Sequence, residues 1–330
     1  MSIESDKNPE NNNTNHARIG KILRKTRSVL KLIKSDQPCP LDVPKSPERP
    51  RKFAVLIAVS YRGQKYELKG TINDVKRMKK WLIGNFEFKP KNILILTEDE
   101  KDKRLKPTKE NIQNSMKWLV KDCREGDSLV FYFSGHGLRQ PDFDEDERDG
   151  WDETICPVDF DKAGMILDNE INATIVRPLP KGVVLHAIVD ACHSGTVLDL
   201  PYVYNRDRKC WDDNRPPSGV YKSTIGGLAI GISACRDDQM AADTDAFNIS
   251  KADMEMSGAL THTLISNVQK EQQITYGQLL DNIYNDIEKA DQRGCLPLRL
   301  LRTLLHERLL QKPQLSSSEP FNIYQKPFVL

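Results

Sequence analysis

The sequence predicts an α/β fold with an open, mostly parallel sheet that is covered by helices on both faces. Two observations carry this prediction. The first is a series of short apolar runs, from residue 52 onward, that are typical of strands buried on both faces. The second is that stretches of helical periodicity alternate with these runs. Because right-handed crossovers join such strands, their carboxyl ends all meet at one edge of the sheet. Open α/β folds hold their functional sites at that edge.

The predicted elements follow from this alternation. Strands are expected at residues 53–61, 92–97, 128–133, 183–191 and 227–234. Asn73 and Thr108 are polar residues that can cap the first turn of a helix, so helices are expected to begin after them. Two further helices are expected at 258–270 and 275–290.

Residues 1–51 are predicted to be a short and largely disordered prosegment. Its first part is polar and rich in Asn, and residues 35–51 hold five prolines. Between these parts, residues 18–34 place apolar and basic side chains at helical spacing, which indicates a basic amphipathic helix. Such a helix could lie on an anionic membrane, bind a partner or act as an import signal, but a solvated helix without a partner is favoured.

Composition excludes several classes of protein. The 49 basic and 47 acidic residues give a net charge of +2, which is too balanced for a nucleic-acid-binding or membrane-surface protein. Neither a membrane-spanning apolar run nor a secretory signal is present, so a cytoplasmic protein is expected, with the nucleus as an alternative. Seven scattered cysteines without a C-x-x-C pair indicate neither a disulfide framework nor a zinc module.

Two of the predicted strands end in chemically active residues. One runs into SGHG at 134–137 and another into DACHSG at 190–195. A thiol on a tight turn with an imidazole within reach is what a cysteine nucleophile requires, so His136 is the candidate base and Cys192 the candidate nucleophile. The backbone N–H groups of Gly137 and Cys192 could then stabilise an oxyanion.

Each motif alone has a simpler explanation. SGHG could be only a turn, and a single cysteine is usually buried and inert. His136, Cys192 and His193 could instead bind a metal ion. The two motifs together favour the nucleophile and its base.

The chain resembles the metacaspases of the plant-like type I class, which are cysteine proteases with the caspase-like (caspase-hemoglobinase) fold. The resemblance covers nearly all of residues 53–330. It rests on YRGQKYELKGTINDV (61–75), SGHG (134–137), DGWDETICPVDF (149–160), ILDNEI (166–171), DACHSG (190–195), SACRDDQMAADT (233–244) and PQLSSSEPFNIYQKPF (313–328). DACHSG differs from the Q-A-C-[RQG]-G signature of true caspases.

The resemblance implies that Asp74, Ser134 and Asp190 line the primary specificity pocket, and that cleavage follows Arg or Lys. The residues give independent support for Asp190. It precedes Cys192 by two positions, so both side chains point the same way in a strand, and its carboxylate would attract a basic side chain. Without the resemblance, Asp74 would be explained as an acid favoured by a helix dipole.

The resemblance also implies a calcium site at Asp152, Asp168, Asn169 and Asp199. Oxygen ligands from separate loops suit calcium, which would order the acidic loops around the cleft. Asn169 stands where the family usually has an acid, so weaker affinity is expected. The acidic run at 142–153 almost fits an EF-hand loop, but Glu147 stands where that loop requires glycine, and the EF-hand is excluded.

The resemblance divides the rest of the chain into subunit-like regions. Residues 52–200 correspond to the large subunit with the catalytic dyad, and 226–330 to the small subunit. Residues 201–225 lack periodicity and are expected to form a long exposed linker. Metacaspases are often processed after basic residues near this junction, although the segment could be only an exposed loop. The candidate processing sites are Arg206, Arg208, Lys209, Arg215 and Lys222.

These expectations add up to a monomeric, calcium-stimulated, self-processing zymogen that cleaves protein or peptide substrates and is linked to cell death or stress responses. Two departures from the family are visible. Thr71 stands where the family often has Cys, and residues 1–50 lack the paired C-x-x-C motifs of a zinc-finger prodomain. The alternative is a catalytically silent scaffold with the same fold, which the presence of both catalytic side chains and their glycines disfavours.

Overall fold

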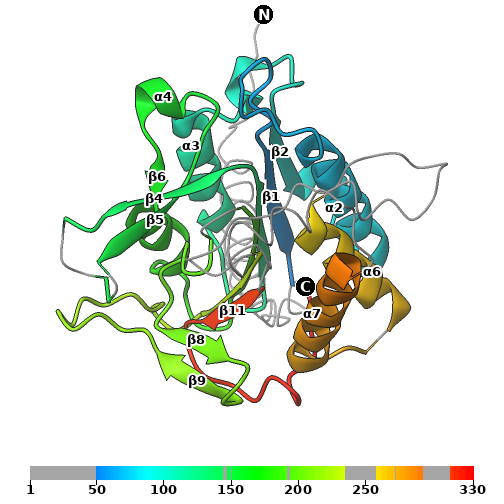
Figure 1. Cartoon of the computed structure of the whole chain (residues 1–330), viewed down its shortest axis with the longest axis vertical. Coiled ribbons are helices and arrows are strands. Elements are labelled where there is room, and N and C mark those ends of the chain that lie inside the picture. The colour runs from blue at the N-terminus through cyan, green and yellow to red at the C-terminus, as the bar shows by residue number, and fades with distance from the viewer. Residues whose placement is uncertain are drawn as a thin grey trace, which may run out of the picture. The chain divides into compact units, whose positions relative to one another are not determined.

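An eight-stranded sheet forms the centre of the computed structural model, with the strand order β2-β1-β3-β7-β10-β11-β8-β9 (Figure 1). The structure describes residues 50–143, 147–148, 150–191, 194–234, 258–271, 273–292 and 313–330. The amphipathic helix predicted at 18–34 lies outside these residues.

All five predicted strands form, and they run parallel to one another. They are β1 (Lys52–Ala58), β2 (Ile93–Thr97), β3 (Ser128–Ser134), β7 (Val184–Asp190) and β10 (Leu228–Ser233). The register aligns Ala58 with Ser134 and Ser134 with Asp190, so the ends of three neighbouring strands lie side by side. This alignment produces the predicted edge at which functional groups collect.

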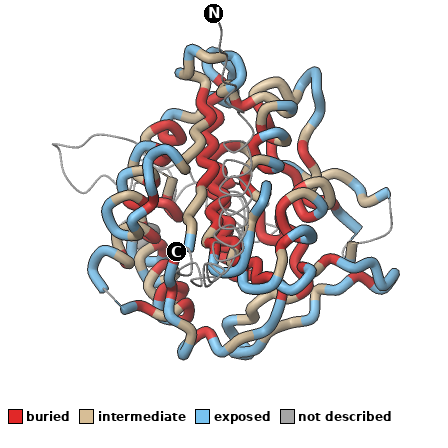
Figure 2. Tube along the Cα trace, turned by 180° about the vertical axis from the view of Figure 1, so that it is seen from behind, coloured by how far each residue is buried: buried red, intermediate tan, exposed pale blue. Residues whose placement is uncertain are grey.

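Helices cover both faces of the sheet, as predicted, and each face has its own apolar core. One face carries α2 (Thr71–Phe86), α6 (Ala259–Lys270) and α7 (Tyr276–Gln292), and the other carries α3 (Lys109–Val120) (Figure 1). The central strands are buried between them (Figure 2). Apolar burial on both faces explains why these strands read as continuous hydrophobic runs.

The helix starts agree only in part with the sequence. Thr108 caps α3, because its side chain accepts a hydrogen bond from the N–H of Asn111. The expected cap at Asn73 is wrong: α2 begins at Thr71, and the carbonyl of Gly70 accepts the N–H groups of Asn73 and Asp74. The buried hydroxyl of Thr71 bonds to that of Ser60, 2.8 Å away, which holds the first turn against the end of β1.

A second, three-stranded antiparallel sheet follows β3 and leads to the acidic part of the chain. It consists of β4 (Gly137–Pro141), β5 (Trp151–Ile155) and β6 (Ile166–Leu167). The short helices α4 (Phe160–Ala163) and α5 (Asp168–Ile171) and the π-helical turn η3 (Asn172–Val176) follow in the same part of the chain. The 3-10 turns η1 (Pro90–Asn92) and η2 (Lys103–Leu105) instead flank β2 of the main sheet. β4 begins directly after His136, and α5 begins at Asp168.

Much of the predicted linker at 201–225 is exposed, but the segment also has regular structure that was not predicted. The segment contains a hairpin of β8 (Tyr202–Asn205) and β9 (Cys210–Asp213), and β8 pairs with β11 (Gln314–Ser317) at the side of the main sheet. The Trp211 indole N–H donates to the carbonyl of Phe321, 2.7 Å away. The hairpin is therefore anchored to the C-terminal segment by contacts that a local sequence pattern does not contain.

None of the helices among the described residues combines the length and the apolar character that crossing a membrane requires.

Candidate functional site

The segments that carry the predicted base and the predicted nucleophile leave the main sheet next to each other. β3 and β7 are neighbours, and the register pairs Ser134 with Asp190. The N–H of Gly135 also donates to the carbonyl of Asp190 at 3.4 Å. Cys192 and His193 lie outside the described residues. The catalytic pair therefore stays a prediction, made for two segments that are adjacent in space.

His136 is held in a defined orientation. Its Nε2 atom lies 2.7 Å from the carbonyl oxygen of Tyr66, and its backbone N–H donates to the hydroxyl of Tyr61 at 2.9 Å. The imidazole packs against the ring of Tyr61, with the ring centroids 4.7 Å apart. Because a carbonyl can only accept a hydrogen bond, Nε2 carries the proton and Nδ1 is the basic nitrogen.

Tyr61 holds His136 in this orientation, and it was not predicted from the sequence as a site residue. Its hydroxyl accepts the N–H of His136 and donates to the carbonyl of Cys156 at 2.7 Å. Burial raises the pKa of Tyr61 well above its usual value, so the phenol stays protonated and can donate. Only its place inside the segment 61–75 of the family resemblance could have drawn attention to it.

The backbone around Tyr61 is fixed by a carboxylate. Tyr61 has a φ of 54°, in the left-handed region. The Glu98 carboxylate accepts hydrogen bonds from the N–H groups of Ser60, Tyr61 and Arg62. A side chain at position 135 would collide with this assembly, because a Cβ on Gly135 would lie 2.8 Å from the Phe133 ring and 3.1 Å from the Tyr61 hydroxyl. Glycine is therefore required before His136.

The three predicted pocket residues come together on the face of the sheet that α2 and α6 cover. Asp74, on α2, and Ser134 and Asp190, at the ends of β3 and β7, are all buried. Burial, followed by the negative charges of Asp74 and Asp190, raises the pKa of the Tyr132 hydroxyl well above its usual value. The negative charges of Asp74 and Asp190 therefore both lie near the Tyr132 hydroxyl.

The first turn of α6 joins the two acids. The N–H of Gly258 donates to Oδ2 of Asp74 at 2.9 Å. Thr261 donates to Oδ2 of Asp190 twice, from its N–H at 2.9 Å and from its hydroxyl at 2.7 Å. Gly258 and Thr261 could not be predicted from the sequence, because both are far along the chain from the acids that they contact.

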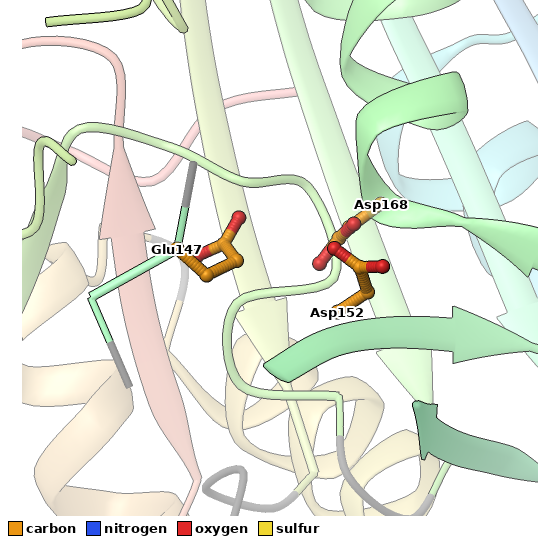
Figure 3. A group of neighbouring side chains, drawn as sticks. All are labelled: Glu147, Asp152 and Asp168. Carbon is orange, nitrogen blue, oxygen red and sulfur yellow. The ribbon is translucent and has the colours of Figure 1, made fainter. Parts of the chain in front are cut away.

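A second group of acids lies beside the small sheet. Glu147, Asp152 and Asp168 each place a carboxylate oxygen within 4.8 Å of the others. Figure 3 shows the carboxyl groups of Asp152 and Asp168 next to each other, with Glu147 to one side of them. We call these three residues the acidic cluster. Two of them were predicted as calcium ligands, whereas Glu147 entered the sequence analysis only as the residue that excludes an EF-hand.

The other two predicted ligands lie close by. The N–H of Asn169 donates to Oδ1 of Asp168, at 2.7 Å. Burial raises the pKa of Asp168 well above its usual value, and the negative charge of Asp199 adds to the increase. Asp199 therefore lies near enough to repel Asp168.

Lys222 supplies positive charge to this region. Its ammonium group lies 2.5 Å from the carboxylate of Glu147 and 2.7 Å from that of Asp199, and all three side chains are buried. Burial and the charge of Asp199 raise the pKa of Glu147 to about 8, although the bond from Lys222 acts in the opposite direction. Lys222 is therefore an internal counter-ion of these acids.

The donor set fits a hard divalent cation. Each member of the acidic cluster offers carboxylate oxygens, which are the ligands that calcium prefers. Burial is the main cause of the raised pKa values of Glu147 and Asp168, and the mutual repulsion of neighbouring carboxylates adds to it. A cation placed among them would remove that repulsion.

The candidate processing sites differ in accessibility. Arg206, Arg208, Lys209 and Arg215 are exposed, on or next to the β8–β9 hairpin. Arg206 is ion-paired with Asp281 and packs over the ring of Tyr284. Lys222 differs, because it is buried and ion-paired, so this conformation does not present it for cleavage.

Comparisons with known proteins agree on one family. The family description "Metacaspase, peptidase C14 domain" matches residues 52–201. Metacaspase-1 of Arabidopsis thaliana is 48% identical over 293 residues, which cover 85% of this chain and 79% of that protein. Metacaspase-2 of the same plant is 45% identical over 312 residues, which cover 86% of this chain and 74% of that protein.

A solved structure supports the fold independently. A protein of Geobacter sulfurreducens superposes with a TM-score of 0.53, at 20% sequence identity, over 85% of this chain and 99% of that one. At this identity the likeness concerns the fold alone. With the open, mostly parallel sheet described above, it confirms the predicted fold class.

Proposed function

Because the chain belongs to the metacaspase family of cysteine peptidases, we propose that it cleaves peptide bonds after Arg or Lys, with Cys192 as the nucleophile and His136 as the base. The observation that carries this proposal is the orientation of His136. The bond from its Nε2–H to the Tyr66 carbonyl leaves Nδ1 as the nitrogen that can accept the proton of a thiol.

The proposed reaction has two halves. Nδ1 of His136 takes the proton of the Cys192 thiol, and the thiolate attacks the scissile carbonyl carbon, whose π electrons move to oxygen. The N–H groups of Gly137 and Cys192 stabilise that oxyanion, and the imidazolium returns its proton to the departing amine. His136 then takes a proton from water, which attacks the thioester, and the released Cys192 sulfur is reprotonated.

The specificity follows from the buried acids. Asp74 and Asp190 would place negative charge where the side chain before the scissile bond binds. Ser134, at the end of β3, lies beside Asp190 in the sheet register. A guanidinium or ammonium group is attracted by such a pair, and a buried Arg–carboxylate contact can be bidentate. An acidic side chain would be repelled, so cleavage after Asp is not expected.

Calcium is proposed as an activator held by Asp152, Asp168 and Asp199, with Glu147 as an added ligand and Asn169 as a neutral oxygen donor. Bound there, the ion would supply the positive charge that offsets the repulsion between the carboxylates. Asp152 lies on β5, which pairs with the strand that begins after His136. By binding Asp152, the ion would order the segment next to His136.

Further proposals concern regulation. Cleavage of the chain by itself at the exposed basic residues of 201–225 would separate a large-subunit-like part (52–200) from a small-subunit-like part (226–330). A monomeric zymogen with a role in cell death or stress responses, acting in the cytoplasm or nucleus, is the corresponding expectation from the family resemblance.

Reporter peptides test the proposed function. The purified protein is incubated with fluorogenic peptides that end in Arg, Lys or Asp, with and without calcium, beside a Cys192→Ala variant. Turnover of the Arg and Lys peptides, increased by calcium and absent from the variant, is expected. Preference for the Asp peptide would contradict the specificity, and no turnover under any condition would indicate a scaffold.

A further inference from the structure

Asp190 is held by a residue of a different element, 71 positions further along the chain. Thr261 is the third residue of α6, and both its N–H and its hydroxyl donate to Oδ2 of Asp190. The side chain is fully buried. In such a place, water is poorly able to replace a hydrogen bond that is lost.

The hydrogen bonds around Thr261 have a defined direction. Its hydroxyl has one proton, which goes to the Asp190 carboxylate at 2.7 Å. The Tyr132 hydroxyl lies 2.7 Å from Oγ1 of Thr261 and must therefore be the donor in that contact. The chain of donors runs from Tyr132 through Thr261 to Asp190. Such a chain favours the ionised carboxylate and fixes the position of Oδ2.

Gly258 shows how closely α6 approaches this carboxylate. A Cβ on Gly258 would lie 2.3 Å from Oδ2 and 3.1 Å from Oδ1 of Asp190. The N–H of the same residue donates to Asp74. One turn of α6 therefore sets the spacing of the two acids, which belong to α2 and β7.

We propose that Thr261 is a positioning residue for substrate selection. By donating to Oδ2 of Asp190, Thr261 orients the carboxylate and stabilises its ionised form. In that form and orientation, Asp190 binds the basic side chain of the substrate. This inference rests on the proposed function, in which Asp190 is a pocket acid. It adds a determinant of specificity that lies outside both strand-end motifs.

Kinetics of Thr261→Val and Thr261→Ser test the proposal. Valine removes the hydroxyl at nearly constant volume, whereas serine keeps it. On an Arg-terminated reporter, Thr261→Val should raise KM by about tenfold or more, which is the range for a lost hydrogen bond to a charged group. Thr261→Ser should stay within about threefold of wild type, because the donor is restored.

A second readout separates positioning from a general effect on the fold. The rate at which iodoacetamide alkylates Cys192 requires the nucleophile and its base but not the pocket. It should be unchanged in Thr261→Val. Equal losses in alkylation rate and in kcat/KM would show a purely structural role and overturn the proposal, as would an unchanged KM. Should Thr261→Val fail to fold, Tyr132→Phe removes the preceding donor and is judged by the same two criteria.

Asp190→Asn distinguishes failure of this inference from failure of the proposed function. If Asp190→Asn abolishes turnover of the Arg reporter while Thr261→Val leaves KM unchanged, only the inference about Thr261 is wrong. If Asp190→Asn also retains wild-type KM, the proposed pocket itself is wrong.

Discussion

The Nε2 atom of His136 lies 2.7 Å from the backbone carbonyl oxygen of Tyr66. This contact determines which imidazole nitrogen can act as a base. It comes from a loop that follows β1, whereas His136 follows β3. The tautomer of the proposed base therefore depends on the packing of two loops that are joined through Tyr61.

Replacing Tyr61 by Phe tests that dependence. The change removes a hydroxyl that satisfies the N–H of His136 and the carbonyl of Cys156. Stability should fall by about 1–3 kcal/mol, the cost of leaving buried polar groups unsatisfied. Turnover should fall through kcat more than through KM, because the base moves while the pocket remains. Urea unfolding and steady-state kinetics measure the two effects.

Tyr66→Phe is the matched control for this variant, because Tyr66 bonds to His136 through its backbone carbonyl and its ring is partly exposed. It should keep near wild-type kcat. Equal kcat in wild type and Tyr61→Phe would refute the supporting role of Tyr61.

Replacing Lys222 by Gln should strengthen calcium binding. The ammonium group neutralises Glu147 and Asp199 and thus competes with an added cation. Its removal should favour calcium by ~1 kcal/mol, or roughly fivefold in Kd. Titration calorimetry in a Cys192→Ala background measures the change, with Lys209→Gln on the exposed hairpin as control. Weaker binding by Lys222→Gln would argue against competition.

Calcium affinity should rise with pH. The pKa of Glu147 is raised to about 8, and that of Asp168 is also raised, so both must lose protons when a cation binds. Because the pKa of Glu147 is raised in the folded protein, its contribution to the stability of the calcium-free fold is complete at low pH. This stability is lost as pH rises toward 8. Calorimetry in buffers of different ionisation enthalpy should detect proton release, and affinity independent of pH would contradict the assignment.

His186 should make the fold sensitive to acid. Burial lowers its pKa to about 3, and its Nε2 atom bonds to the Tyr276 hydroxyl. A lowered pKa gives stability that is complete above the unfolded value near 6.5 and is lost as pH falls toward 3. The loss amounts to at most about 5 kcal/mol. The unfolding temperature, measured at a series of pH values, should fall less steeply with decreasing pH in His186→Gln than in the wild type. An unchanged dependence of the unfolding temperature on pH would exclude His186 as the cause.

The sequence was a good guide where the signal is local and apolar. β1, β3 and β7 are buried on both faces and therefore read as continuous hydrophobic runs. Their parallel arrangement brings the segments after Ser134 and Asp190 to one edge, as predicted. The segment after Ser134 contains the candidate base, so its place in the fold followed from strand order alone.

Features that depend on distant contacts could not be predicted in the same way. The strands β8 and β9 have only four residues each, and they are anchored by the contact between Trp211 and Phe321. The bond between Thr261 and Asp190 and the contact of Lys222 with Glu147 likewise join residues far apart in the chain. No periodicity or spacing encodes such pairs, because they arise only when the layers pack.

In the proposed reaction, Cys192 is activated by His136 and attacks substrates that carry a basic residue. Mass spectrometry after treatment with a peptidyl chloromethyl ketone ending in Arg identifies the residue that attacks. We expect a single adduct on Cys192, formed much more slowly in His136→Ala and not formed with the analogue ending in Asp. An adduct on another residue, or equal labelling by the Asp analogue, would contradict it.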